Sequence, residues 1–152
     1  MLEKNAHPDL GSYQHVVTAC ACGNLRKTSR AITQLYDGFL EPSGLLSTQM
    51  MLLGAIGTNP TITLKPLAER LGMDPTTLAR NLKPLERDGL IAISKGTDCR
   101  TREVSLTQQG QKALVNAYPL WEQAQAYVSS QFGADRLQAM LDDLSELTSK
   151  LR

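Results

Sequence analysis

Apolar residues recur every three or four positions through most of the chain, the spacing that lines one face of an α-helix. The pattern predicts helices over residues 12–39, 47–56, 64–71, 75–88, 108–129 and 134–151. Residues 90–94 and 102–106 are short aliphatic-rich runs, which is typical of β-strands, and the polar residues 95–101 between them would form a hairpin tip. We therefore expect a mainly α-helical fold with a small two-stranded β-wing.

Residues that favour helix ends support these boundaries. Ser47, Asp74 and Thr107 have side-chain oxygens that can accept hydrogen bonds from the first free N–H groups of a helix. Pro75 then stands at a first helical position, where its missing N–H is not needed. Gly72 follows the third helix, where a left-handed residue commonly ends a helix.

Two short helices, a tight turn and a hairpin predict a winged helix-turn-helix, which we place at residues 45–106. At about 100° per residue, one side of its second helix gathers leucines within about 60° of arc. These are Leu78, Leu82 and Leu85. The opposite side gathers hydroxyls and cations, which are Thr76, Arg80, Lys83 and Arg87, with Thr77 beside them. A charged face is often only solvated surface, but hydroxyls and arginines are also what phosphate and guanine contacts require. Pro84 predicts a kink or a tightened last turn in this helix.

The hairpin adds a second basic feature. Asp98, Arg100 and Arg102 alternate along the chain, so their side chains would share one side of a strand. Such charges can simply keep an edge strand from pairing with other chains. An arginine at a hairpin tip also fits the narrow, electronegative minor groove of DNA. Together with the helix face, the wing makes double-stranded DNA the expected partner.

Composition sets limits rather than a function. The chain has 152 residues, of which 41% are hydrophobic and 20% charged, and its net charge is +1. These values fit one globular domain, residues 1–152, and the small net charge does not by itself indicate nucleic acid. No apolar run reaches the roughly 20 residues that span a bilayer, and the start lacks a signal-peptide core. We expect a cytoplasmic protein with no membrane partner and no cofactor.

The stretch TLARNLKPLERDGLIAISKGTDCRTREVSLTQQGQKAL resembles the MarR (multiple antibiotic resistance regulator) family. The shared elements are the LERDGL helix exit, the D-x-R-x-R wing and the LTxxG start of the next helix; GLLSTQMMLL fits the preceding helix. The resemblance implies a homodimeric regulator on a palindromic operator, with residues 12–39 and 107–152 as dimerisation helices. A seam of apolar residues independently suggests a partner; it comprises Leu137, Leu141, Leu144, Leu147 and Leu151.

The same resemblance assigns roles to single residues. Thr76, Thr77 and Arg80 would read the major groove, and Arg100 would enter the minor groove. Arg102, or Asp98 through it, would brace the wing. Family members respond to small phenolic ligands, oxidants or metals, so the resemblance implies regulation by a signal that it does not identify. Operator binding could repress or activate a gene; we expect a repressor released by its signal, because blocking a promoter is the simpler physical outcome.

Cys20 and Cys22 invite a redox or metal interpretation. On an intact helix, residues two apart point about 200° from each other, which disfavours a disulfide between them or a shared metal ion. His15 with Cys20 would give only two metal ligands, so no metal site is expected. Cys99 lies in the wing, where its oxidation could disturb DNA contact, although an exposed spectator is the simpler interpretation.

CGNLRKTSRAITQLYDGFLEPSGLL is similar to the first helix of the organic-hydroperoxide sensor branch of the family. The similarity makes Cys22 the peroxide-sensitive thiol and Tyr36 one of the tyrosines that polarise it. Arg26 and Ser47 stand where that branch has further tyrosines. Three interpretations stay open: packing of Cys22 at a dimer interface, oxidant sensing, or a pocket in which Arg26 receives an anionic inducer.

Enzymatic alternatives have little support in the sequence. His7 and His15 are the only histidines, and no metalloprotease, nucleophile-elbow, P-loop or dinucleotide-binding motif is present. A thiol peroxidase built on Cys22 is the most serious enzyme hypothesis. A winged helix used only for protein contact is the third possibility, and it would not need Arg80 or Arg100. We expect a regulator rather than an enzyme.

Overall fold

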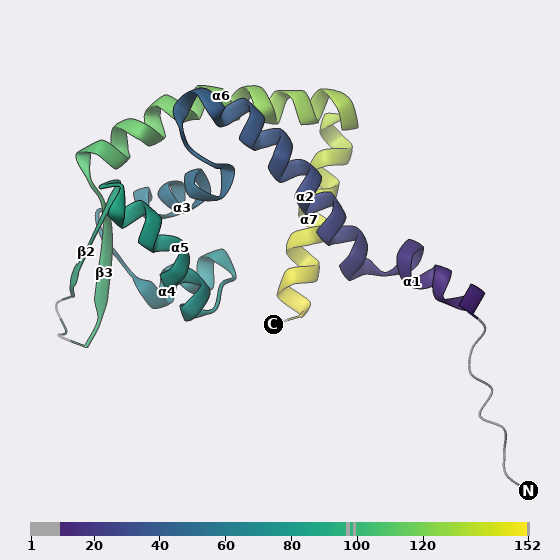
Figure 1. The fold of residues 1–152 in the computed structure, drawn as a ribbon, viewed down its shortest axis with the longest axis horizontal. Coiled ribbons are helices and arrows are strands. Elements are labelled where there is room, and N and C mark those ends of the chain that lie inside the picture. Colours follow the sequence, from purple (N-terminus) through teal and green to yellow (C-terminus); the bar gives the residue numbers. More distant parts are fainter. Residues whose placement is uncertain (1–9, 97, 99, 152) are drawn as a thin grey trace, which may run out of the picture. The chain divides into compact units, whose positions relative to one another are not determined.

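The computed structural model describes residues 10–96, 98 and 100–151 (Figure 1). The chain divides into two compact units, Met1–Leu35 and Tyr36–Arg152. Helices make up most of both, and the strands belong to the second unit. The expected mainly helical fold with a small β-wing is confirmed.

The first unit contains a short 3₁₀ helix η1 (Leu10–Tyr13), helix α1 (Gln14–Ala19) and most of helix α2 (Ala21–Leu40). The prediction of one unbroken helix over residues 12–39 is wrong, because Cys20 has an extended backbone with ψ 113°. None of the residues from 13 to 35 is buried, and Val17 is 77% exposed.

Side chains around Cys20 explain the break between α1 and α2. The Asn24 amide donates hydrogen bonds to the carbonyl oxygens of Thr18 and Cys20, at 3.0 Å each. The sulfur of Cys20 accepts a bond from the backbone N–H of Gly23 at 3.4 Å, as an N-cap side chain does. These bonds satisfy backbone groups that an unbroken helix would have paired internally.

The second unit begins with the end of α2 and a 3₁₀ turn η2 (Glu41–Ser43), which Gly44 ends in a left-handed conformation with φ 74°. Helices α3 (Ser47–Gly57), α4 (Leu64–Leu71) and α5 (Pro75–Arg87) follow. Long helices α6 (Gln108–Phe132) and α7 (Ala134–Lys150) complete it. All of these lie within two or three residues of the predicted bounds.

A small antiparallel sheet lies beside these helices. The two predicted strands are present as β2 (Ile91–Lys95) and β3 (Arg102–Leu106). A third strand, β1 (Ile62–Thr63), pairs with β3 and gives the order β1-β3-β2. Residues 62 and 63 lie outside the predicted helices and strands, so the sheet has one short strand more than predicted.

The core lies between α3, α4, α5 and the sheet. Its most buried side chains have at most 1% exposure and are Leu40, Leu53, Ile56, Leu67, Leu78, Leu82, Leu85, Val104 and Ala117. The three leucines predicted for the inner side of α5 are therefore confirmed as core. Their burial fixes the rotation of α5, so that its opposite side faces solvent.

Helix starts follow the predicted caps with one shift. Asp74 and Thr107 are the N-caps of α5 and α6. Ser47 is the first residue of α3 rather than its N-cap, and its backbone N–H donates to the Asp37 carboxylate at 2.7 Å. The side chain of Gln49 accepts from the N–H of Leu46, the residue that actually precedes the helix.

Candidate nucleic-acid interface

The start of α5 is held by two hydrogen bonds that Thr77 donates to Asp74. The Asp74 carboxylate accepts the backbone N–H of Thr77 at 2.9 Å and the Thr77 hydroxyl at 2.6 Å. The hydroxyl bond is the main reason that the pKa of Asp74 is lowered, with the backbone bond second. The Thr77 proton is thus used inside the protein, while Thr76 is exposed beside it. Of the two threonines, Thr76 has the freer hydroxyl for a DNA contact.

The outer side of α5 presents the predicted cations to solvent. Arg80, Lys83 and Arg87 are exposed, on the side opposite the buried leucines. Among the residues that the structure describes, neither Arg80 nor Lys83 has an ion-pair partner. Pro84 lies within α5, and the helix continues past it; its carbonyl accepts the N–H of Asp88 at 2.9 Å. Pro84 therefore does not end the helix.

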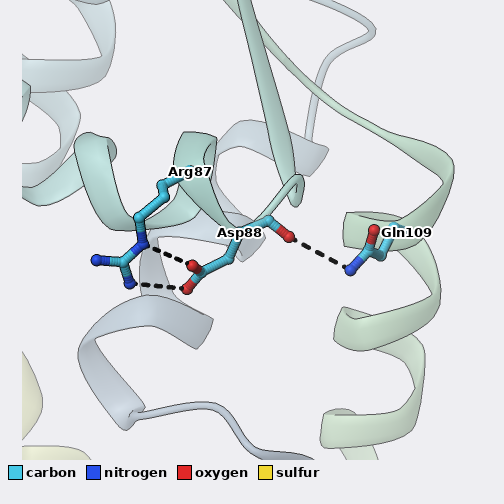
Figure 2. Close-up of polar contacts among 3 residues, drawn as sticks. All are labelled: Arg87, Asp88 and Gln109. Atoms are coloured by element: carbon cyan, nitrogen blue, oxygen red, sulfur yellow. Dashed lines mark hydrogen bonds and ion pairs between the residues drawn. The ribbon is translucent and has the colours of Figure 1, made fainter.

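Arg87 differs from the other cations because it has a partner. Its guanidinium forms a two-bond ion pair with Asp88, at 2.9 and 3.4 Å (Figure 2). Hydrogen bonding to this carboxylate, followed by its charge, raises the pKa of Arg87. The side chains are 75% and 44% exposed, so the pair is screened by water and can open at small cost.

The wing tip is organised by Asp98 through the backbone. Its carboxylate accepts the N–H of Arg100 at 3.1 Å, and its carbonyl accepts both the N–H and the hydroxyl of Thr101 at 2.8 Å. Within residues 10–96, 98 and 100–151, Asp98 forms no ion pair with Arg100 or Arg102. The exposed Arg100 guanidinium is thus available for a contact with a partner molecule. Cys99, the spectator or redox candidate in the wing, lies outside the described residues.

A tight junction joins the end of α5 to the start of α6. The Thr107 hydroxyl donates to the Gly89 carbonyl at 2.6 Å and accepts the N–H of Gly110 at 3.0 Å. The Thr107 N–H donates to the Leu90 carbonyl at 3.1 Å. A Cβ atom on Gly110 would lie 1.9 Å from that same carbonyl oxygen. The LTxxG pattern thus encodes a close approach that only glycine permits.

Gln109 extends this junction and was not singled out from the sequence. Its side-chain amide donates to the backbone carbonyl of Asp88 at 3.3 Å, next to the Arg87 ion pair (Figure 2). Gly89 turns the chain from α5 into β2 with φ 71°. Because α6 holds both ends of this turn, the orientation of α5 depends on the start of α6.

The candidate sensor residues lie in different units. Cys22 and Arg26 are exposed in the first unit, and Cys20 is half-buried. Tyr36 belongs to the second unit, where its hydroxyl donates to the side-chain oxygen of Gln125 and burial raises its pKa. A pocket of Cys22, Arg26 and Tyr36 therefore stays a prediction.

The helix break also changes the interpretation of the cysteine pair. On an intact helix Cys20 and Cys22 would point away from each other, whereas Cys20 has an extended backbone. That geometric objection to a disulfide no longer holds. In the part of the chain that the structure describes, no three metal-ligating side chains come together. None of the described helices has the length and apolar character needed to cross a membrane.

Comparisons with known proteins agree with this geometry. A family model described as winged helix-turn-helix DNA-binding matches residues 45–92. The organic hydroperoxide resistance transcriptional regulator of Bacillus subtilis is 32% identical over 90 residues, which cover 59% of this chain and 61% of that protein. The chain spans about three fifths of the length of the curated relatives that it matches.

Solved structures match over more of the chain. The M. tuberculosis transcriptional regulator MosR in complex with DNA is 38% identical, has a TM-score of 0.78, and covers 88% of this chain and 98% of its own. A mutant of MarR from E. coli complexed with operator DNA is 21% identical with a TM-score of 0.77, covering 87% of this chain and 96% of its own. At that lower identity the likeness concerns the fold alone.

Proposed function

Because the chain belongs to the MarR family of DNA-binding transcriptional regulators, we propose that it is a homodimeric repressor. It binds a palindromic operator in double-stranded DNA and is released by an oxidant or a small anionic molecule. The observation that carries the proposal is the outer side of α5, where exposed Arg80 and Lys83 have no ion-pair partner among the described residues. Thr76 lies on the same side, near the start of the helix.

The proposed contacts divide between the two grooves. Thr76 and Arg80, from the first turns of α5, read base edges in the major groove, with Thr77 beside them. Lys83 and Arg87, further along the same side, hold phosphates, and Arg87 opens its ion pair with Asp88 to do so. Arg100 enters the minor groove from the wing, whose shape Asp98 maintains.

Exposed apolar side chains support a homodimer. Leu141 and Leu147 on α7 are 43% and 40% exposed, and Leu151 just after the helix is 76% exposed. They continue the seam that starts at the buried Leu137. A second copy of the same seam is a self-complementary partner for such a surface, because two-fold interfaces bring one patch against itself. On a palindromic operator the two copies of α5 would then lie one turn of DNA apart, which is about 34 Å.

The signal is proposed to act at the first unit. Cys22 is exposed, as a thiol that meets peroxide must be. A relative of the chain is an organic hydroperoxide resistance regulator, which supports an oxidant. Arg26 is exposed one helical turn further along and would instead receive an anionic or phenolic inducer.

Binding to DNA selected from a randomised library tests the function. Arg80→Ala and Arg100→Ala should each weaken binding to the selected operator at least about 30-fold, because a base contact is worth about 1–3 kcal/mol and a homodimer loses two copies of it. Lys112→Ala on α6 also removes one exposed cation and should leave operator binding unchanged. If both arginine variants bind like the wild type, α5 and the wing do not read DNA, and a protein-contact module becomes the better interpretation.

A further inference from the structure

Two cations face each other across the strands of the wing. Lys95 on β2 and Arg102 on β3 are directly paired in the antiparallel register. Residues paired in this way have Cβ atoms about 4.5–5.5 Å apart on the same face of the sheet. Like charges in this arrangement repel each other and destabilise the pair. Both side chains are exposed, which leaves them open to an anion from outside.

The carboxylates nearest in sequence to Lys95 and Arg102 do not neutralise these two cations. Glu103 is paired with Ser94 and therefore lies on the opposite face of the hairpin. Its Oε1 lies 3.0 Å from the position that a Cβ on Gly96 would occupy. The Asp98 carboxylate is occupied by the N–H of Arg100. Over residues 10–96, 98 and 100–151, the ion pairs are Arg87–Asp88 and Lys150–Glu146, so nothing described neutralises the pair.

The face that carries the two cations is also the face toward the helices. The next pair on this face, Ile93 and Val104, packs against the core, and Val104 is fully buried. One pair further along, Lys95 and Arg102 form the last pair of the two strands, next to the hairpin tip. They are thus on the same side of the sheet as α5, and between the core and the Arg100 tip.

We propose that Lys95 and Arg102 together bind the phosphate backbone of DNA at the base of the wing. A phosphate placed between them removes their repulsion, with Arg102 offering a planar fork and Lys95 a point charge. This contact holds the strand beside the minor groove that Arg100 enters. It gives Arg102 a direct role in place of the expected brace, and it assigns a role to Lys95. The inference rests on the proposed function, since it names further contacts to the same partner.

The salt dependence of DNA binding tests this contact. Each phosphate contact contributes about 0.9 to the slope of log K against log salt concentration, so its loss from both protomers of a dimer should reduce the slope by about 1.8. We expect this reduction for Lys95→Gln and for Arg102→Gln, measured on the full chain. Lys112→Gln is the control and should keep the wild-type slope. The affinity loss should be equal on the selected operator and on a scrambled duplex, because phosphates carry no sequence information.

The stability of the free protein supplies the second measurement. Removing one of two repelling cations should leave thermal unfolding of Lys95→Gln at or above the wild-type temperature, so weaker binding cannot come from misfolding. An unchanged salt slope in both variants, or a loss seen only on the operator, would overturn the phosphate contact. If the wild-type protein selects no DNA sequence from the library, both the proposed function and this contact are overturned. Wild-type binding with unchanged variant slopes would overturn the contact alone.

Discussion

Replacing Gly110 with alanine should destabilise the protein strongly, although alanine favours helices. Gly110 is buried at the start of α6, and an added Cβ would lie 1.9 Å from the Leu90 carbonyl oxygen and 2.9 Å from its carbon. A carbon and an oxygen normally approach to about 3.3 Å. The two segments must therefore separate by more than about 1 Å, which breaks the Thr107 bonds to Gly89 and Leu90 at 2.6 and 3.1 Å.

The expected magnitude combines three effects. Overpacking a tight site costs about 1–3 kcal/mol. Each lost hydrogen bond costs about 1 kcal/mol, and two are affected. Alanine in place of glycine in a helix returns about 1 kcal/mol. The free energy of unfolding of Gly110→Ala should thus fall by about 2–4 kcal/mol.

Urea unfolding at one fixed protein concentration measures this difference, since a dimer's stability depends on concentration. Gly54→Ala on α3 is the matched control, because no atom lies within 4 Å of its added Cβ. The control should gain about 0.5–1 kcal/mol. If Gly110→Ala were as stable as Gly54→Ala, the junction between Leu90 and α6 would not be the close contact described.

Three further predictions concern the cap, the dimer and the thiol. Asp74→Asn keeps a capping oxygen without a titrating group. Because hydrogen bonds lower the native pKa of Asp74, the wild type should lose stability relative to this variant as pH falls below about 4. Thermal-unfolding temperatures that change in parallel for the two proteins from pH 7 to 2 would contradict this. Leu141→Glu should weaken dimerisation at least about 100-fold, because about 1.5–3 kcal/mol of leucine burial is lost in each of two copies. Analytical sedimentation measures the dimer affinity, and a wild-type value would argue against the α7 seam. Cys22→Ser should bind operator normally yet no longer be released by peroxide. Release as in the wild type would exclude this thiol as the sensor. Catalytic consumption of peroxide by the wild type would instead favour a thiol peroxidase.

Local signals predicted most of the fold, because they act over a few residues. Asp74 and Thr107 cap the helices that their positions indicated. The leucine spacing of α5 correctly gave its buried side, and so the exposed side that carries the candidate site. A helix period and an N-cap can be seen in the sequence, since each depends on residues within one turn.

The remaining features depend on contacts between distant residues. Strand β1 was missed because Ile62 becomes a strand residue only by pairing with Val104. The α5–α6 junction was missed because Gly110 meets Leu90, which lies on another element. The helix break at Cys20 depends on Asn24 reaching back to two carbonyls, which no propensity indicates.

The central claim is that two copies of α5 lie one DNA turn apart on a palindromic operator. The most direct measurement is the affinity of the wild-type protein for its selected operator and for the same duplex with five base pairs inserted between the half-sites. Because a turn of DNA is about 10–10.5 base pairs, the insertion rotates one half-site by about half a turn. We predict that affinity falls toward that for scrambled DNA. Equal affinity for the two duplexes would contradict the claim.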